Sequence, residues 1–172
     1  DLQTRFVDYT FEGFNENGDI ANQTVNLRFF NPKYGLFYSL NNNSSFYVSY
    51  SEGKREPNRN DYIESSPNSR PKPEILFDTE LGYRFNSKNL ALGINLYNMD
   101  YKNQLVNTGE INDVGASVHS NIDESFRRGI EVETNLKLSN KLNWSGNITF
   151  SENKIVAHSE YIDNWDTWGK DT

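Results

Sequence analysis

Apolar and polar residues alternate along most of the chain with a period of two. Segment 74–85, EILFDTELGYRF, shows this most clearly. One set of alternate positions is mainly apolar: Ile75, Phe77, Thr79, Leu81, Tyr83 and Phe85. The other set is mainly ionic or small: Glu74, Leu76, Asp78, Glu80, Gly82 and Arg84. Because successive side chains of a β-strand point to opposite faces of its sheet, the period predicts a strand with one apolar and one ionic face.

The same period recurs in other segments, so the sequence predicts about seven strands in all. The other six segments are 2–9, 34–41, 45–52, 90–101, 127–138 and 142–151. Short connections rich in turn-forming residues are predicted at 41–44, 86–89 and 139–141. Long loops are predicted at 11–30, 55–72 and 102–121, and from 155 onward. Short and long connections alternate strictly, so all short turns are expected at one end of an antiparallel sheet and all long loops at the other.

Two architectures fit this pattern, a soluble β-sandwich and a membrane β-barrel. Several predicted strands span about 10 residues, which is enough to cross a bilayer at a tilt. Glu131, Glu133 and Lys137 share one face, where burial in a sandwich core would be costly but a water-filled lumen would not. Aromatic residues such as Tyr83 and Trp144 lie near the predicted strand ends, as interfacial girdles require. The pattern therefore favours an all-β, antiparallel up-and-down transmembrane β-barrel with short periplasmic turns and long extracellular loops.

Composition and charge narrow the function classes. Apolar residues make up only 35% of the chain, yet aromatics reach 14%, which argues against disorder. No apolar run approaches the roughly 18 residues of a spanning helix. The absence of cysteine excludes disulfides and thiolate metal sites, and the net charge of −7 disfavours binding to nucleic acid. The first residues carry no signal-peptide pattern, and seven strands are too few for a barrel with a polar lumen, so we expect a segment of a larger barrel.

Several short motifs resemble one receptor family when taken together. One strand ends in Arg55-Glu56-Pro57, and the next opens with Pro73-Glu74 and continues into the segment ELGY at 80–83. Three further matches are FFNPKYGLFY at 29–38, YKNQLVNTGEINDVG at 101–115 and RRGIEVE at 127–133. In these motifs the chain is similar to TonB-dependent outer-membrane receptors of the Bacteroidetes type, and the similarity covers nearly all of its length.

The resemblance implies a 22-strand barrel with an N-terminal plug in its lumen. Such receptors import a scarce nutrient across the bacterial outer membrane, using energy passed on by TonB. Residues 1–172 would then be part of one barrel domain, with the plug domain and the remaining strands absent from this sequence. The implied partners are outer-membrane lipid, the plug and TonB through the parent chain, and a small ligand. A ferric siderophore, haem or cobalamin is expected ahead of a glycan. Two alternatives stay open: a soluble β-sheet domain that binds through its long loops, and a segment of a passive porin.

The arginine-rich loop after residue 54 is the main candidate for ligand contact. Guanidinium groups offer paired donors suited to carboxylate, catecholate or hydroxamate oxygens, and neighbouring side chains add neutral and acidic partners. The last loop adds aromatic rings that can stack on a sugar or a chelate. The candidate ligand-binding residues are Arg59, Asn60, Asp61, Tyr62, Arg70, Tyr161, Trp165 and Trp168.

A second set of residues is expected to have a structural role in the loop or the lumen. It consists of Arg55, Glu56, Pro57, Glu74, Glu80, Arg127 and Glu131. We expect the charged side chains of the predicted lumen face to form cross-strand ladders.

Catalysis and resident cofactors have little support in the sequence. His119 and His158 both fall in predicted loops, and neither has an obvious catalytic partner. Asp163, Asp166 and Asp171 are spaced too loosely for an EF-hand loop. The sequence therefore predicts no enzyme, no resident metal and no cofactor.

Overall fold

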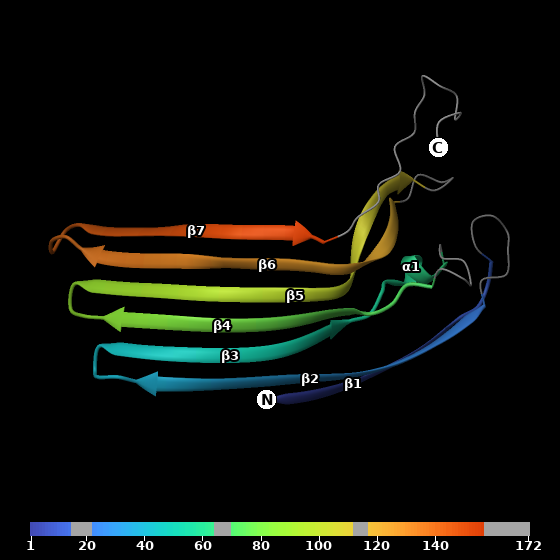
Figure 1. Ribbon diagram of the computed structural model, residues 1–172, viewed down its shortest axis with the longest axis horizontal. Coiled ribbons are helices and arrows are strands. Elements are labelled where there is room, and N and C mark those ends of the chain that lie inside the picture. Colours follow the sequence, from blue (N-terminus) through green and yellow to red (C-terminus); the bar gives the residue numbers. More distant parts are fainter. Residues whose placement is uncertain (15–21, 64–69, 112–116, 157–172) are drawn as a thin grey trace, which may run out of the picture.

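The computed structural model describes residues 1–14, 22–63, 70–111 and 117–156. These residues form seven strands in one antiparallel sheet, ordered from β1 to β7 as in the sequence (Figure 1). The strands are β1 Leu2–Phe11, β2 Gln23–Ser39, β3 Ser44–Arg55, β4 Glu74–Asn86, β5 Leu90–Ile111, β6 Ser117–Lys137 and β7 Asn143–Ile155. A five-residue helix, α1 Arg59–Ile63, lies between β3 and β4. The predicted up-and-down arrangement is confirmed.

Short turns and long connections lie at opposite ends of the sheet. The turns that join β2 to β3, β4 to β5 and β6 to β7 all lie at one end, on the left in Figure 1. Each is closed by a short backbone hydrogen bond, as from Leu40 N to Ser44 O at 2.9 Å and from Leu138 N to Leu142 O at 2.9 Å. β1, β3 and β5 end, and β2, β4 and β6 begin, at the other end. We call these the short-turn end and the long-loop end.

Two of the predicted long loops are wrong in extent. β2 begins at Gln23, within the loop predicted at 11–30, and β5 and β6 continue as paired strands through most of the loop predicted at 102–121. Past Lys102, polar residues occupy both faces of the β5–β6 hairpin, so hydrophobic alternation ends where backbone pairing does not. The pattern detected only the part of each strand that has an apolar face.

The strand register places apolar side chains in continuous rows across the sheet. One row consists of Leu36, Val48, Leu81, Leu96, Ile130 and Phe150, each opposite the next on neighbouring strands. The adjacent row points to the opposite face and consists of Phe37, Tyr47, Gly82, Asn95, Glu131 and Thr149. The predicted apolar and ionic faces of the individual strands therefore combine into two continuous faces of one sheet.

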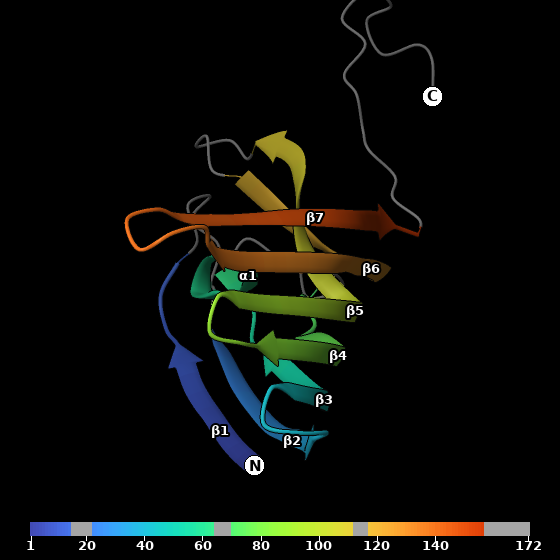
Figure 2. The same cartoon turned by 90° about the vertical axis from the view of Figure 1, so that its left-hand side faces the viewer.

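The apolar face is left uncovered, and the polar face is the inner one. Leu36 is 75% exposed and Phe150 is 62% exposed, which suits contact with lipid. Figure 2 looks along the sheet from its short-turn end and shows the strands following an arc, with α1 on the inner side. The hydrophobic core is correspondingly small: Phe11, Val25 and Tyr62 are buried together, with Leu27 packed against them. This core ties α1 to the inner face of β1 and β2.

Charged side chains mark one border of the apolar face. Toward the long-loop end, the row after Tyr50 contains Glu52, and Glu52 pairs with Lys54 at 2.6 Å. Arg128 pairs with Glu152 at 2.7 Å at a similar level of β6 and β7. The apolar band therefore ends before the strands do. Across the described residues, no helix is long and apolar enough to cross a membrane.

Candidate functional site

The segment that follows β3 is held in place at three successive residues. Arg55 Nη2 lies 3.1 Å from Glu74 Oε2, on the strand that pairs with β3. Glu56 accepts hydrogen bonds from both terminal nitrogens of Arg5 on β1. Pro57 is fully buried. These contacts fold the chain inward at the long-loop end, so that α1 lies against the inner face of β1 and β2.

Helix α1 begins with a capping contact and ends on the small core. Asp61 Oδ2 accepts a hydrogen bond of 2.7 Å from Asn58 N, one half of the capping box that stabilises a helix start. The ring of Tyr62 lies 6.1 Å from that of Phe11, and Tyr62 O accepts a hydrogen bond of 2.7 Å from Gln23 Nε2. Contacts at both ends therefore fix this short helix. Its sequence, RNDYI, does not predict them.

The sequence-predicted ligand residues separate into groups. Arg59 is exposed, and its guanidinium carbon lies 5.8 Å from the centre of the Phe11 ring. Tyr62 is buried in the core, whereas Arg70 is exposed. Asn60 belongs to α1, but its side chain falls outside what the structure describes. Tyr161, Trp165 and Trp168 also lie outside the described residues, as does His158. The ligand roles of all eight candidates stay predictions.

A set of contacts that the sequence did not reveal joins β4 to the β5–β6 hairpin. The buried carboxylate of Glu74 accepts from Leu105 N at 3.3 Å as well as from Arg55. The Asn121 side chain accepts from Lys72 N at 2.7 Å and donates to Lys72 O at 3.0 Å. It also donates to Asn103 O at 2.7 Å. We call this set of contacts the hairpin clamp. The only signal for it in the sequence is the high asparagine content of residues 98–121.

Asn103 marks the point where the hairpin leaves the sheet. Its φ of 52° lies in the left-handed region, which asparagine adopts more readily than most residues. Beyond this residue β5 no longer pairs with β4, and it continues with β6 alone. Figure 1 shows the β5–β6 hairpin bending away from the other strands there.

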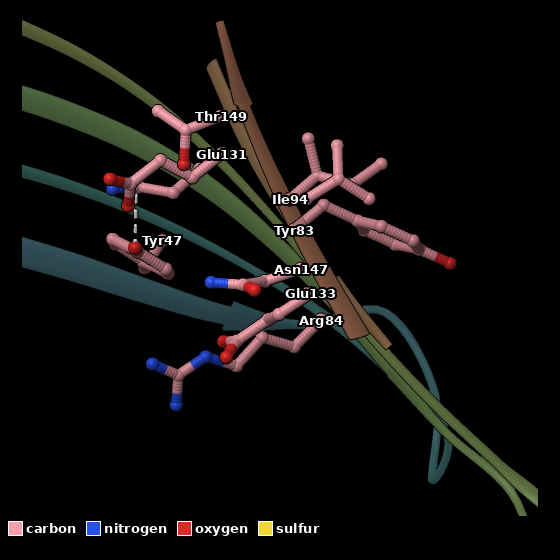
Figure 3. Close-up of a pocket in the computed structure, with 11 residues that line it drawn as sticks. Tyr47, Tyr83, Arg84, Ile94, Glu131, Glu133, Asn147 and Thr149 are labelled. Carbon is pink, nitrogen blue, oxygen red and sulfur yellow. Dashed lines mark hydrogen bonds between the residues drawn. The ribbon is translucent and has the colours of Figure 1, made fainter. Parts of the chain in front are cut away.

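A hollow of about 170 Å³ opens on the inner face nearer the short-turn end (Figure 3). Glu131, Glu133, Asn147, Thr149 and Arg84 point to one side of the sheet in Figure 3, and Tyr83 and Ile94 to the other. The Tyr47 hydroxyl donates to Asn95 Oδ1 at 2.9 Å across this hollow. Its polar lining suits water or a polar chain segment better than an apolar ligand.

Two glycines make the hollow possible. A Cβ on Gly82 would overlap the Tyr47 ring at Cε1 and Cζ, and a Cβ on Gly93 would lie 2.9 Å from Glu133 Cγ. Both glycines stand directly opposite these residues on neighbouring strands. Each large side chain therefore occupies the space that a Cβ on the opposite glycine would need.

Of the cross-strand charge pairs predicted for the inner face, the described residues form one, between Arg55 and Glu74. Within the described chain, Glu80, Arg127 and Glu131 form no ion pair, and the register explains why. Glu131 faces Asn95, and Glu80 faces Tyr97 and Ser49. The arginines instead lie over aromatic rings, with Arg127 5.4 Å from the ring centre of Tyr101.

No metal centre forms in the part of the chain that the structure describes, where His, Asp and Glu side chains nowhere come together in threes. His119 lies on β6, but its side chain is not among the described parts of the chain.

Comparison with known proteins identifies the architecture. The model of the family described as "TonB dependent receptor-like, beta-barrel" matches residues 1–172. The fold is similar to the FrpB iron transporter from Neisseria meningitidis, with a TM-score of 0.65 and 19% identity over 89% of this chain and 23% of that one. It is also similar to the siderophore receptor PirA from Pseudomonas aeruginosa, with a TM-score of 0.63 and 19% identity over 88% of this chain and 32% of that one.

The copper transporter OprC gives a TM-score of 0.70 and 15% identity, over 90% of this chain and 26% of that protein. The chain thus spans about a quarter to a third of the length of these proteins, and identities this low show the fold alone. No curated protein sequence matches the chain.

Proposed function

Because the chain belongs to the TonB-dependent receptor-like β-barrel family, whose members lie in the bacterial outer membrane, we propose that it supplies barrel wall and extracellular loops to a nutrient receptor. In this proposal, residues 1–172 are part of one barrel domain, and the plug domain and remaining strands belong to the rest of the parent chain. The family is one of transport receptors rather than enzymes. The Bacteroidetes-type origin stays a prediction.

We propose a chelated metal as the nutrient, with a ferric siderophore or haem first and cobalamin next, ahead of a glycan. The structural neighbours support this class, because they are an iron transporter, a siderophore receptor and a copper transporter. The chemistry of the long-loop end is compatible with it. A guanidinium presents paired N–H donors to the carboxylate, catecholate or hydroxamate oxygens of an iron chelate.

The observation that carries the proposal is the inward fold of the segment from Arg55 to Tyr62. The contacts of Glu56 and Pro57 bring α1 over the inner face, while Arg59 keeps an exposed guanidinium beside Phe11. A cation fixed at the extracellular opening of a barrel is in position to contact an anionic chelate before the chelate enters the lumen. We therefore assign first ligand contact to Arg59, with Arg70 as a second cation.

Binding of defined chelates to the full-length receptor tests this assignment. Ferric catecholate, ferric hydroxamate, ferric citrate, haem and cobalamin are titrated separately against receptor in detergent. Loss of one charge-assisted hydrogen bond is worth about 1.5–3 kcal/mol, so Arg59→Gln is expected to weaken binding of the preferred chelate about 10- to 100-fold. The matched control is Arg28→Gln, because Arg28 lies over the ring of Phe6 instead. Equal affinities for the Arg59 variant and the wild type would contradict the assignment.

Two further measurements separate the alternatives. Uptake that continues at full rate in a strain without TonB would indicate a passive porin. Release of the full-length protein from membranes by carbonate, without detergent, would indicate a soluble domain. Energy-dependent uptake and retention in the membrane are the expected results.

A further inference from the structure

We propose that Asn121 is a positioning residue that makes the two long-loop structures, α1 with its flanking segment and the β5–β6 hairpin, move as one body. This inference rests on the proposed function, because it concerns the loops that would meet the ligand. It goes further by assigning a mechanical role to a residue outside the predicted ligand set.

The geometry of the Asn121 amide is the first step. A side-chain amide has one acceptor oxygen and two N–H donors, and all three functions are engaged here. Asn121 Oδ1 accepts from Lys72 N at 2.7 Å, and Nδ2 donates to Lys72 O at 3.0 Å and to Asn103 O at 2.7 Å. The side chain thus pairs with the Lys72 backbone as a neighbouring strand would, in the segment just before β4.

The second step concerns the strands on either side of the hairpin. Past Lys102, β5 has lost its pairing with β4, and β7 pairs with β6 only as far as Ser125. Among the described strands, neither β4 nor β7 therefore pairs with the hairpin beyond its base. Asn103, with its left-handed backbone, sits at this departure and accepts one of the Asn121 hydrogen bonds. A hairpin that has no neighbouring strand on either edge pivots at its base unless side chains fix the angle.

The third step links the clamp to the ligand segment. Glu74 lies two residues after Lys72, and its carboxylate accepts from both Arg55 and Leu105 N. Arg55 begins the segment that continues through Glu56 and Pro57 to α1. The chain of contacts from Asn121 through Lys72 and Glu74 to Arg55 therefore joins the hairpin base to the base of the ligand segment, without a gap.

Distance measurements between spin labels on the full-length receptor test the coupling. The chain has no cysteine of its own, so labels are placed at Asn58→Cys beside α1, Ser120→Cys on the hairpin and Ser145→Cys on the wall as reference. Asn121→Asp keeps the size and the acceptor but removes both N–H donations. Asn135→Asp is the matched control, because it makes the same change elsewhere on β6.

In the wild type, all three label pairs are expected to give narrow distance distributions. Two lost hydrogen bonds together correspond to about a tenfold or larger shift in population. Asn121→Asp is therefore expected to broaden the distances from position 120 to positions 58 and 145, while Asn135→Asp leaves them narrow. Unchanged distances in Asn121→Asp would overturn the proposal. Broadening that is equal in both variants would also overturn it.

A chelate titration on the same labelled receptors then tests the shared movement. If the two structures move as one body, ligand shifts the distances from 58 to 145 and from 120 to 145 together in the wild type, and separately in Asn121→Asp. Separate movement in the wild type would overturn the coupling. The measurements without ligand stand by themselves, so a failure to bind any chelate would contradict the proposed function and leave the clamp decided on its own data.

Discussion

Arg55 at the end of β3 and Glu74 at the start of β4 stand directly opposite each other in the sheet and form a salt bridge of 3.1 Å. The Glu74 side chain is almost buried, with 11% of it exposed, whereas the Arg55 side chain is 64% exposed. The pair thus closes the base of a loop whose two ends it joins. This relationship gives a physical reason for the Arg-Glu-Pro and Pro-Glu motifs to occur together in one sequence.

Glu74→Leu is expected to destabilise the full-length receptor. Arg55 can turn toward water, but the Leu105 N–H loses its acceptor in a mostly buried position, which costs about 1–3 kcal/mol. Urea unfolding in lipid vesicles measures this difference. The control is Glu52→Leu, which breaks an ion pair on the other face of β3. An equal loss of stability in the two variants would show that the inner-face position of Glu74 contributes no more than the outer-face position of Glu52.

Arg5 and Glu56 offer a charge-reversal test of the inward fold. Arg5→Glu and Glu56→Arg each place like charges together at the contact that ties the segment to β1, so each is expected to expose the peptide bonds around Pro57 to protease. The double variant restores opposite charges and is expected to restore resistance. Limited proteolysis of the membrane-embedded receptor reports the cleavage rate. A double variant that is cleaved as fast as either single variant would argue against this ion pair as the anchor.

Gly82→Ala is expected to destabilise the barrel by about 1–3 kcal/mol, because the added methyl group would overlap the ring of Tyr47. Gly53→Ala is the matched control on β3, where an added Cβ meets no atom within 4 Å. Combining Gly82→Ala with Tyr47→Ala removes the overlap. The combined variant should therefore lose less stability than the sum of the two single variants, and strict additivity in the unfolding measurement would refute the steric cause.

Val48 and Ser49 test which face of the sheet meets lipid. Val48 belongs to the apolar row and Ser49 points to the inner face. Val48→Arg places a charge in the hydrocarbon region and is expected to cost about 2–4 kcal/mol near the bilayer midplane, whereas Ser49→Arg enters a wet lumen at little cost. The folded fraction after assembly into vesicles measures both. Equal tolerance of the two arginines would contradict the membrane orientation.

The sequence allowed the faces and the order of the strands to be predicted because lipid on one side and water on the other impose a period of two. Leu81 and Gly82 fall on opposite faces for that reason alone. The outer halves of β5 and β6 were missed because polar residues occur on both of their faces there, which interrupts the alternation. Their pairing depends on contacts between residues far apart in sequence, which no local pattern records.

The candidate site was predictable only as a region. Arg59 was identified by its chemistry, and its exposure beside Phe11 is compatible with the assigned contact. Tyr62 was chosen in the same way, for its polar hydroxyl group. Its side chain is nevertheless buried against Phe11. Asn121 could not be identified at all, because its importance comes from the Lys72 backbone, which lies 49 residues away along the chain.

The apolar row from Leu36 to Phe150 also bears on how such a wall avoids assembly errors. Each strand from β2 to β7 contributes one member, and each member is opposite the next. A slip of one residue in any hairpin would turn that strand's charged side chains toward lipid and its apolar ones toward water. The penalty would grow with every residue of the slipped strand that lies in the hydrocarbon. The contrast between lipid on one side and water on the other therefore disfavours a misaligned strand before the next hairpin pairs with it.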